Sequence, residues 1–386
     1  MRALWPFSFY FLLFAGHASV GPFFVLYYQR LGFTGAQIGL ITGITPLVTL
    51  CFAPLWSRIA DRTLRHRWIM GLALLCAVAI LSVFPLLRAF APILAIALLL
   101  SAVLAPVMPF ADNASMFILG DRRELYGRVR LGGTIGYGVA ASITGLVVQT
   151  HGIRFAFWIC AILFASALLT SRKLAHGGVR SHADSGGSFC TVLRTPRWLL
   201  FLGIAFAAGM ALASFNYLYP YMRELGASES MMGFALTLGT IAEIPVLFFG
   251  HHLIRRFRPY GVLVLAMLLT GARLLLFAAN AEPSLVLAIQ LLNGFTFPLM
   301  WVAGVSYAHE MAPEGMTTTA QGLFSGATYG FGMAAGGFLG GPLLEAIGGR
   351  GLYLVFGSVT LAITLLIVLL QSRLPALRSS PSGTAP

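Results

Sequence analysis

Twelve long hydrophobic stretches fill almost the whole of this 386-residue chain, and the second six repeat the first six. The repeat has an offset of 194 residues and is visible in the pairs Leu31 and Leu225, Gly32 and Gly226, Gly39 and Gly233, and Gly136 and Gly330. About 20 apolar residues form one helix across the hydrocarbon core of a bilayer. The sequence therefore predicts an all-α membrane protein with twelve transmembrane helices in two parallel six-helix repeats. Many secondary transporters with this architecture bind their substrate between the halves.

The predicted spans divide the chain into two bundles. The spans are expected at residues 7–28, 36–57, 68–88, 92–119, 127–150, 152–171, 197–222, 229–250, 259–279, 284–309, 317–342 and 351–371. The expected parts are an N-terminal bundle at 1–171, a cytoplasmic linker at 172–196, a C-terminal bundle at 197–371 and a cytoplasmic tail at 372–386. The linker is rich in Gly, Ser and His, which is typical of a flexible connection. Metal binding by its His176 and His182 is the less favoured alternative.

The net charge of +13 follows from membrane topology rather than from nucleic-acid binding. Hydrophobic residues make up 58% of the chain and charged residues 10%, which excludes an ordinary soluble domain. With a cytoplasmic N-terminus, 19 of the 25 Lys and Arg residues fall on the cytoplasmic side, five on the other side and Arg273 within a helix. The positive-inside rule thus predicts a multi-pass protein of the cell inner membrane with both termini in the cytoplasm. We expect it to be a monomer in the lipid bilayer, with no nucleic-acid partner.

The sequence lacks the residue patterns of common enzymes and metal sites. It has no phosphate-binding loop, no H-E-x-x-H pair and no nucleophile elbow. Its four cysteines, Cys51, Cys76, Cys160 and Cys190, form no C-x-x-C pair, so we expect no disulfide, metal site or cofactor. These features favour a transporter over a membrane enzyme. A sensor that binds its ligand without transporting it is the alternative.

A basic loop between the second and third spans resembles the loop signature of the major facilitator superfamily, G-x-x-x-D-R-x-G-R-R. Asp61, Arg62 and Arg65 match that signature, whereas Ser57 and Leu64 replace its two glycines. A carboxylate at a helix end can accept from a neighbouring helix N-terminus or pair with an arginine. We therefore expect Asp61, Arg62 and Arg65 to form a conformational latch on the cytoplasmic side. A solvated, positive-inside loop is the alternative.

Four further segments resemble the phenylpropionate permease branch of that superfamily. They are PFADNAS at 109–115, YGRVRLGGTIGYG at 126–138, NYLYPYMRELG at 216–226 and GTIAEIP at 239–245. The resemblance implies the major facilitator fold and proton-coupled uptake of a small aromatic acid such as 3-phenylpropionate by alternating access. Relatives of the branch include the lactose permease and nucleoside-proton symporters, so a proton-coupled symporter of a sugar or nucleoside is the alternative. The antiport signature G-x-x-x-G-P is absent from Gly132 to Gly145, which also favours uptake.

Asp112 and Arg130 are charged residues within the fourth and fifth predicted spans. Each costs about 2.5–3.5 kcal/mol at a helix centre, so such residues usually face an interior and serve a function. Both should lie in the cytoplasmic half, where an ion pair would relieve both costs. The lactose permease carries a similar carboxylate and arginine that bind sugar, which implies a binding or gating role here. A static pair that only orients two helices is the alternative.

Glu243 and Arg273 are the charged residues within the eighth and ninth spans. No basic residue lies within a helical turn of Glu243, and a low-dielectric setting favours the protonated form of an isolated carboxylate. We expect Glu243 to carry the coupled proton, with Asp112 as the second candidate; a permanently protonated structural acid is the alternative. Arg273 lies about four helical turns beyond Arg258, which places it in the outer half of its helix. Glu243 falls in the inner half of its own helix, so we expect the two to be too far apart for a tight resting pair. Its role is open between structure and proton coupling.

Polar and aromatic faces complete the predicted cavity. One face of the tenth span carries Gln290, Asn293, Phe297 and Trp301 at helical spacing, and the seventh span offers Asn216 and Tyr217. A second stripe on the eleventh span comprises Gln321, Ser325, Thr328 and Gly332. An anionic substrate would need Arg130 or Arg273, the intramembrane cations. A neutral sugar or nucleoside would instead use Asp112, Asn216, Gln290 and Asn293.

Overall fold

The computed structural model describes residues 4–122, 125–175, 195–313 and 316–373, and within these ranges its regular elements are all helical. Among the described residues, ten helical segments are long and apolar enough to span a membrane. The last of them, Thr317–Arg373, breaks at Gly348, where a φ of 69° requires glycine, and therefore contains two spans. A further span is formed by α12 (Glu229–Phe257), a helix of 29 residues. The described residues thus confirm the predicted twelve-helix architecture.

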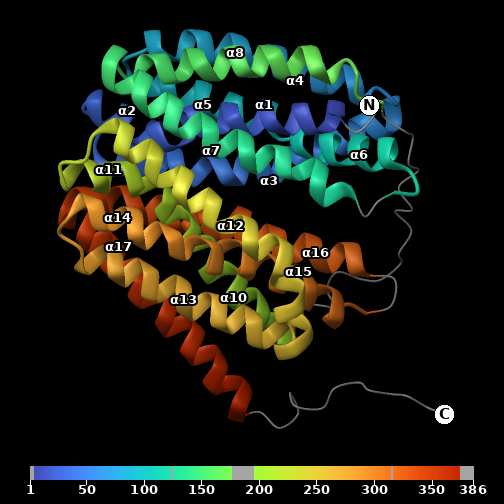
Figure 1. Ribbon diagram of the computed structural model, residues 1–386, viewed down its shortest axis with the longest axis vertical. Coiled ribbons are helices and arrows are strands. Elements are labelled where there is room, and N and C mark those ends of the chain that lie inside the picture. The colour runs from blue at the N-terminus through green and yellow to red at the C-terminus, as the bar shows by residue number, and fades with distance from the viewer. Residues whose placement is uncertain (1–3, 123–124, 176–194, 314–315, 374–386) are drawn as a thin grey trace.

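Each half of the chain forms its own bundle, one coloured blue to green and the other yellow to red in Figure 1. The first half contains α1 (Leu4–Val20), η1 (Gly21–Phe23), α2 (Phe24–Arg30), α3 (Gly35–Thr63), α4 (His66–Val83), η2 (Phe84–Leu86), α5 (Phe90–Leu104), α6 (Val107–Leu119), α7 (Tyr126–His151) and α8 (Arg154–Ser171). The second half contains α10 (Pro196–Ala213), η4 (Ser214–Tyr217), α11 (Leu218–Glu224), α12, α13 (Pro259–Ala279), α14 (Pro283–Gln290), η5 (Leu291–Phe295), α15 (Phe297–Met311), α16 (Thr317–Ser325), η6 (Gly326–Gly332) and α17 (Met333–Arg373).

The sequence repeat reappears in the helix ends. Helix α11 begins and ends 194 residues after α2, and α12 begins and ends 194 residues after α3. The first span of each half is interrupted by a short tighter turn, η1 in the first half and η4 in the second. The fourth span of each half is also interrupted, between α5 and α6 in the first half and at η5 in the second. Interrupted helices at corresponding positions of two repeats are typical of transporters, in which they surround the binding site. Most of the predicted linker, including His176, His182 and Cys190, and most of the predicted tail lie outside the described residues.

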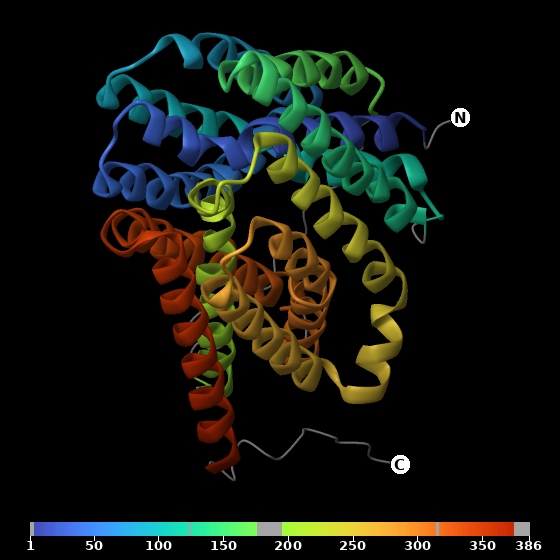
Figure 2. The same cartoon turned by 60° about the vertical axis from the view of Figure 1, so that its left-hand side comes forward.

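Among the described residues, the most extensive contacts between the bundles are those of α3 with α17 and of α7 with α12 (Figure 2). Both contacts run along glycines. Gly341 lies against the backbone of Gly35 and Gly39, and Gly145 lies against Glu229 and Gly233. A Cβ atom at either position would meet the facing backbone, so only glycine allows this approach. The repeat-related pair Gly39 and Gly233 thus serves the same purpose in both halves.

One end of the molecule is closed by hydrogen bonds that cross between the bundles at the N-termini of α3 and α12. The amide of Gly35 donates to Glu345 Oε2 at 2.7 Å, and the amide of Ser230 donates to Gln149 Oε1 at 3.2 Å. Gln149 lies near the C-terminus of α7, and Glu345 lies just before the break in α17 at Gly348. The two acceptors thus occupy similar positions in the two repeats. A helix N-terminus has unpaired N–H groups that favour such acceptors. This end is called the closed end below.

A charged pair and a buried tyrosine strengthen the closed end. Arg30 Nη2 lies 2.7 Å from Glu229 Oε1, across the two bundles. Further inward, the hydroxyl of Tyr217 donates to the carbonyl of Gly337 at 2.9 Å and lies 3.0 Å from Thr42 Oγ1. Since the contacts from Arg30 to Glu229 and from Thr42 to Tyr217 join one bundle to the other, they must break together if the closed end opens.

Candidate functional site

A cavity of about 1140 Å³ lies between the bundles and extends away from the closed end. Its wall includes Phe14, Met108, Asp112, Arg130 and Thr134 from the first half and Glu243, Phe297, Trp301, Ser325 and Tyr329 from the second. It reaches Ser57 on the last two turns of α3 and the exposed Arg128 at the start of α7, so it is open to solvent at that end. Both halves contribute charged residues to one accessible space.

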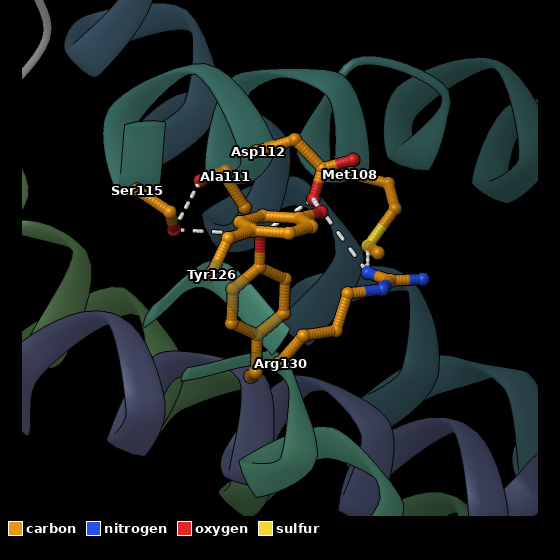
Figure 3. A network of polar contacts seen from close by, with 7 residues as sticks. Met108, Ala111, Asp112, Ser115, Tyr126 and Arg130 are labelled. Carbon is orange, nitrogen blue, oxygen red and sulfur yellow. Dashed lines mark hydrogen bonds and ion pairs between the residues drawn. The ribbon is translucent and has the colours of Figure 1, made fainter. Parts of the chain in front are cut away.

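Asp112 is the centre of a cluster assembled from three helices (Figure 3). Its Oδ1 atom accepts from the hydroxyl of Tyr10 at 2.5 Å and from that of Tyr126 at 2.8 Å, and it lies 3.6 Å from Arg130 Nη1. Sequence reasoning brought Asp112 and Arg130 together but missed both tyrosines. Tyr126 lies within a motif already noted, whereas nothing near Tyr10 in the sequence links α1 to α6.

The Asp112 and Arg130 side chains remain accessible from the cavity. Each keeps 40% of its surface exposed, and the guanidinium lies over the rings of Tyr10 and Phe14 at 5.5 Å and 5.4 Å. A purely structural pair would be expected to bury both groups. The exposed carboxylate accepts and the exposed guanidinium donates, so the pair can hold vicinal hydroxyls or a single carboxylate.

Glu243 is the second carboxylate of the cavity, and it belongs to a polar chain in the other bundle. Asn293 Nδ2 donates to Glu243 Oε1 at 2.6 Å, and Asn293 Oδ1 accepts from Arg273 Nη1 at 2.7 Å. The guanidinium also donates to Thr296 Oγ1 at 3.2 Å and to Gln290. One amide therefore bridges Glu243 and Arg273. The two are closer than their expected depths implied, because counting residues along a straight helix ignores the η5 turn that carries Asn293, but their contact runs through this amide rather than through a direct ion pair.

Arg273 and Gln290 lie behind the cavity wall. Their exposed fractions are 9% and 1%, and Arg273 borders a separate cavity of about 50 Å³ inside the second bundle. Asn293 is also buried and faces Glu243 rather than the large cavity. In this conformation the three side chains are held by one another or by Glu243, and none of them is part of the large cavity's wall.

The predicted helix-seven contacts also lie elsewhere. Tyr217 is fully buried at the closed end, and its neighbour Asn216 in η4 is not part of the large cavity's wall. Phe297 and Trp301 on α15 do line the cavity, as expected from their spacing. Direct solute contact in this conformation is therefore open to Phe297 and Trp301 but not to the fully buried Tyr217.

An aromatic residue missed by sequence reasoning, Tyr329, lines the cavity from η6. The helical stripe predicted Thr328 on the cavity face, but Thr328 is fully buried and Tyr329 is 39% exposed. The wall residues on this span share one helical face, and they are Gly322, Ser325, Gly326, Tyr329 and Gly330. The predicted stripe that contains Gln321 and Thr328 therefore lies one residue off along the helix.

The predicted latch makes a different contact from those expected. Asp61 Oδ1 lies 3.0 Å from His66 Nε2, and His66 is the first residue of α4. Arg62 and Arg65 are exposed at the same loop. Asp61 thus joins the end of α3 to the start of α4 within one bundle, at the open end of the cavity.

Comparison with known proteins places the chain in context. The sequence profile of the MFS_1 like family matches residues 4–355. The maltose permease of Geobacillus stearothermophilus is 28% identical over 372 residues, which cover 95% of this chain and 93% of that protein. A probable 3-phenylpropionic acid transporter of Escherichia coli (strain K12) is 22% identical over 314 residues, 77% of this chain and 80% of that protein. A solved structure of the nucleoside transporter NupG, in a variant form, has the same fold, with a TM-score of 0.85, 18% identity and coverage of 96% and 99%.

Proposed function

The chain belongs to the MFS_1 like family of secondary transporters, and on that premise we propose that it is a proton-coupled importer of a small organic solute. Membership confirms the resemblance to the major facilitator superfamily and sets the chain among transporters rather than enzymes. The observation that carries proton coupling is the pair of carboxylates, Asp112 and Glu243, that face one cavity from opposite bundles. We infer a monomer in the cell inner membrane.

The two carboxylates are suited to different tasks. Asp112 Oδ1 accepts from two hydroxyl groups and lies near a guanidinium, so a change at this carboxylate would disturb three partners at once. Glu243 receives one amide donor on Oε1. Its Oε1 can accept that bond whether or not Oε2 carries a proton, so Glu243 can gain and lose a proton without disturbing Asn293. We therefore assign the coupled proton to Glu243 and substrate contact to Asp112.

The distribution of charge gives the cavity its orientation. With 19 basic residues on the side that holds the termini, the open end lies in the cytoplasm. The structure then corresponds to an inward-facing state, and the closed end is the outer gate. Loading from outside requires the Gly35–Glu345 cap and the Arg30–Glu229 pair to break.

The charges on the cavity wall favour a neutral substrate. Asp112 and Arg130 already neutralise each other, and Arg273 is occupied by amide and hydroxyl oxygens behind the wall. A neutral solute leaves this balance unchanged, whereas an anion brings a further negative charge next to Asp112 in a partly desolvated space. We infer a hydroxyl-rich glycoside, either a sugar or a nucleoside, whose hydroxyls bind Asp112 and Arg130.

An aromatic acid is the second candidate substrate, and one observation favours it. The exposed guanidinium of Arg130 lies above the rings of Tyr10 and Phe14, so a carboxylate with an attached phenyl group would meet a cation beside an apolar surface. This is the aromatic-acid uptake that the sequence resemblance implied. It differs from the first candidate in requiring Arg130 to leave Asp112 for the substrate.

Uptake into proteoliposomes tests the proposal. The full chain is reconstituted, a pH gradient is imposed, and the accumulation of maltose, uridine, 3-phenylpropionate and cinnamate is measured, with protein-free liposomes as the control. We expect accumulation of maltose or uridine that a protonophore abolishes. Accumulation of the acids alone would establish the second candidate. Binding without any accumulation would refute transport and establish a sensor.

A further inference from the structure

Trp301 and Tyr329 meet in the cavity wall of the second bundle. Their ring centroids are 5.0 Å apart, and the planes are tilted by 54°. Trp301 comes from α15 and is supported from behind by Phe324, at 5.2 Å. Both residues border the large cavity, and together they are called the aromatic corner below.

The backbone presents Tyr329 to the cavity through an uncommon conformation. Residues Gly326–Gly332 form a π-helical turn within a long helix, a feature that is rare and often found at functional sites. The turn buries Thr328 and leaves its hydroxyl without a partner among the described residues, while the ring of Tyr329 is turned outward. The next residue, Gly330, packs on Leu50 of α3, which fixes the turn against the opposite bundle.

Tyr329 shares the cavity wall with both charged parts of the site. Arg130 of the first bundle and Glu243 of the second line the same cavity. A large aromatic surface left in contact with water costs free energy that a ligand surface can recover. The position thus combines an accessible ring face with nearby hydrogen-bonding groups, which is the arrangement that a ring-bearing polar solute needs.

We propose that the aromatic corner stacks against the ring of the substrate and makes Tyr329 a specificity-determining residue for ring-bearing glycosides. The inference rests on the proposed transport function and narrows its substrate class. The C–H face of a sugar ring or the flat face of a nucleobase packs on the corner, and the hydroxyls of the same molecule reach Asp112 and Arg130. An open-chain polyol has the hydroxyls but lacks the ring face, so it binds weakly.

Variants at Tyr329 separate the ring from the hydroxyl. Dissociation constants for maltose, uridine and the open-chain polyol sorbitol are measured by calorimetry on the full chain in nanodiscs. We expect Tyr329→Phe to bind the ring-bearing probe within about twofold of the wild type. Tyr329→Leu should weaken that binding about 3- to 10-fold, as loss of an aromatic contact does. Phe331→Leu is the matched control, because Phe331 lies on the same turn, is 60% exposed and is not part of the cavity wall.

The two levels of the proposal fail in different ways. If neither maltose nor uridine binds the wild type, the glycoside assignment is overturned and the corner with it. If the wild type binds and Tyr329→Leu binds equally well, or if Tyr329→Phe is as weak as Tyr329→Leu, the corner alone is overturned. Tyr329→Met, which also lacks an aromatic face, replaces the leucine variant if that variant does not fold.

Discussion

Replacing Glu243 with glutamine should uncouple transport from the proton gradient while leaving the site intact. Glutamine has the shape of the protonated acid and keeps an Oε1 atom. This atom can accept the hydrogen bond that Asn293 Nδ2 donates to Glu243 Oε1 at 2.6 Å in the wild type. The bridge from Asn293 to Arg273 therefore persists, and no buried donor loses its partner. The variant can no longer release a proton, so it should shuttle between its two states carrying substrate alone.

The size of the effect follows from the gradient. One pH unit corresponds to about 1.36 kcal/mol, so with one proton per substrate and the membrane potential clamped, the wild type accumulates its substrate about tenfold. Glu243→Gln should equilibrate the substrate to a ratio of about one, while counterflow of labelled substrate continues. Glu310→Gln is the control, because Glu310 is exposed near the end of α15 and lies outside the cavity wall. Full gradient-driven accumulation by Glu243→Gln would refute the assignment of the proton to this residue.

Three further predictions address the rest of the site. Asp112→Ala and Arg130→Ala should each reduce transport or folded yield, and the double variant should recover part of the loss. The double-mutant cycle should give a coupling energy of about 0.5–3 kcal/mol, whereas strict additivity would show that the pair does not interact. In competition assays, maltose or uridine should inhibit uptake more strongly than 3-phenylpropionate or cinnamate, and the reverse order would assign the acids. Glu345→Ala removes a charge-assisted hydrogen bond of about 1–2 kcal/mol to the amide of Gly35. Spin labels placed across the closed end should therefore report an open population about fivefold larger or more. An unchanged distance distribution would contradict that role for the cap.

The features that a sequence can predict here are those set by period and length. Apolar stretches of bilayer length determine the number and position of the spans, and the offset of the sequence repeat carries through to the ends of α2, α3, α11 and α12. Asp112 and Arg130 could be paired because they lie at similar depths on consecutive helices, a short-range argument. Phe297 and Trp301 could be placed because α15 is regular between them.

The features that sequence reasoning missed depend on local breaks in helical regularity and on contacts between distant helices. The cavity face of the eleventh span runs one residue off the predicted stripe, so Tyr329 lies on it in place of Thr328. The η5 turn places Asn293 between two charges thought to lie apart. Tyr10 reaches Asp112 from a distant part of the sequence, and no local pattern records that contact. A shift of one residue in register, or one contact between distant helices, thus decides which side chains meet the solute.

One helix connects the proposed outer gate to the proposed proton site. The first residue of α12, Glu229, pairs with Arg30 at the closed end, and Glu243 lies about four turns further along the same helix, in the cavity wall. The helical rise places the two carboxylates roughly 21 Å apart, too far for direct electrostatic influence at physiological salt. They are coupled through the position of α12, which packs on α7 along glycines and cannot shift locally without moving that contact. Proton binding at Glu243 therefore influences the gate only through movement of α12 against the first bundle, which is the movement that alternating access requires.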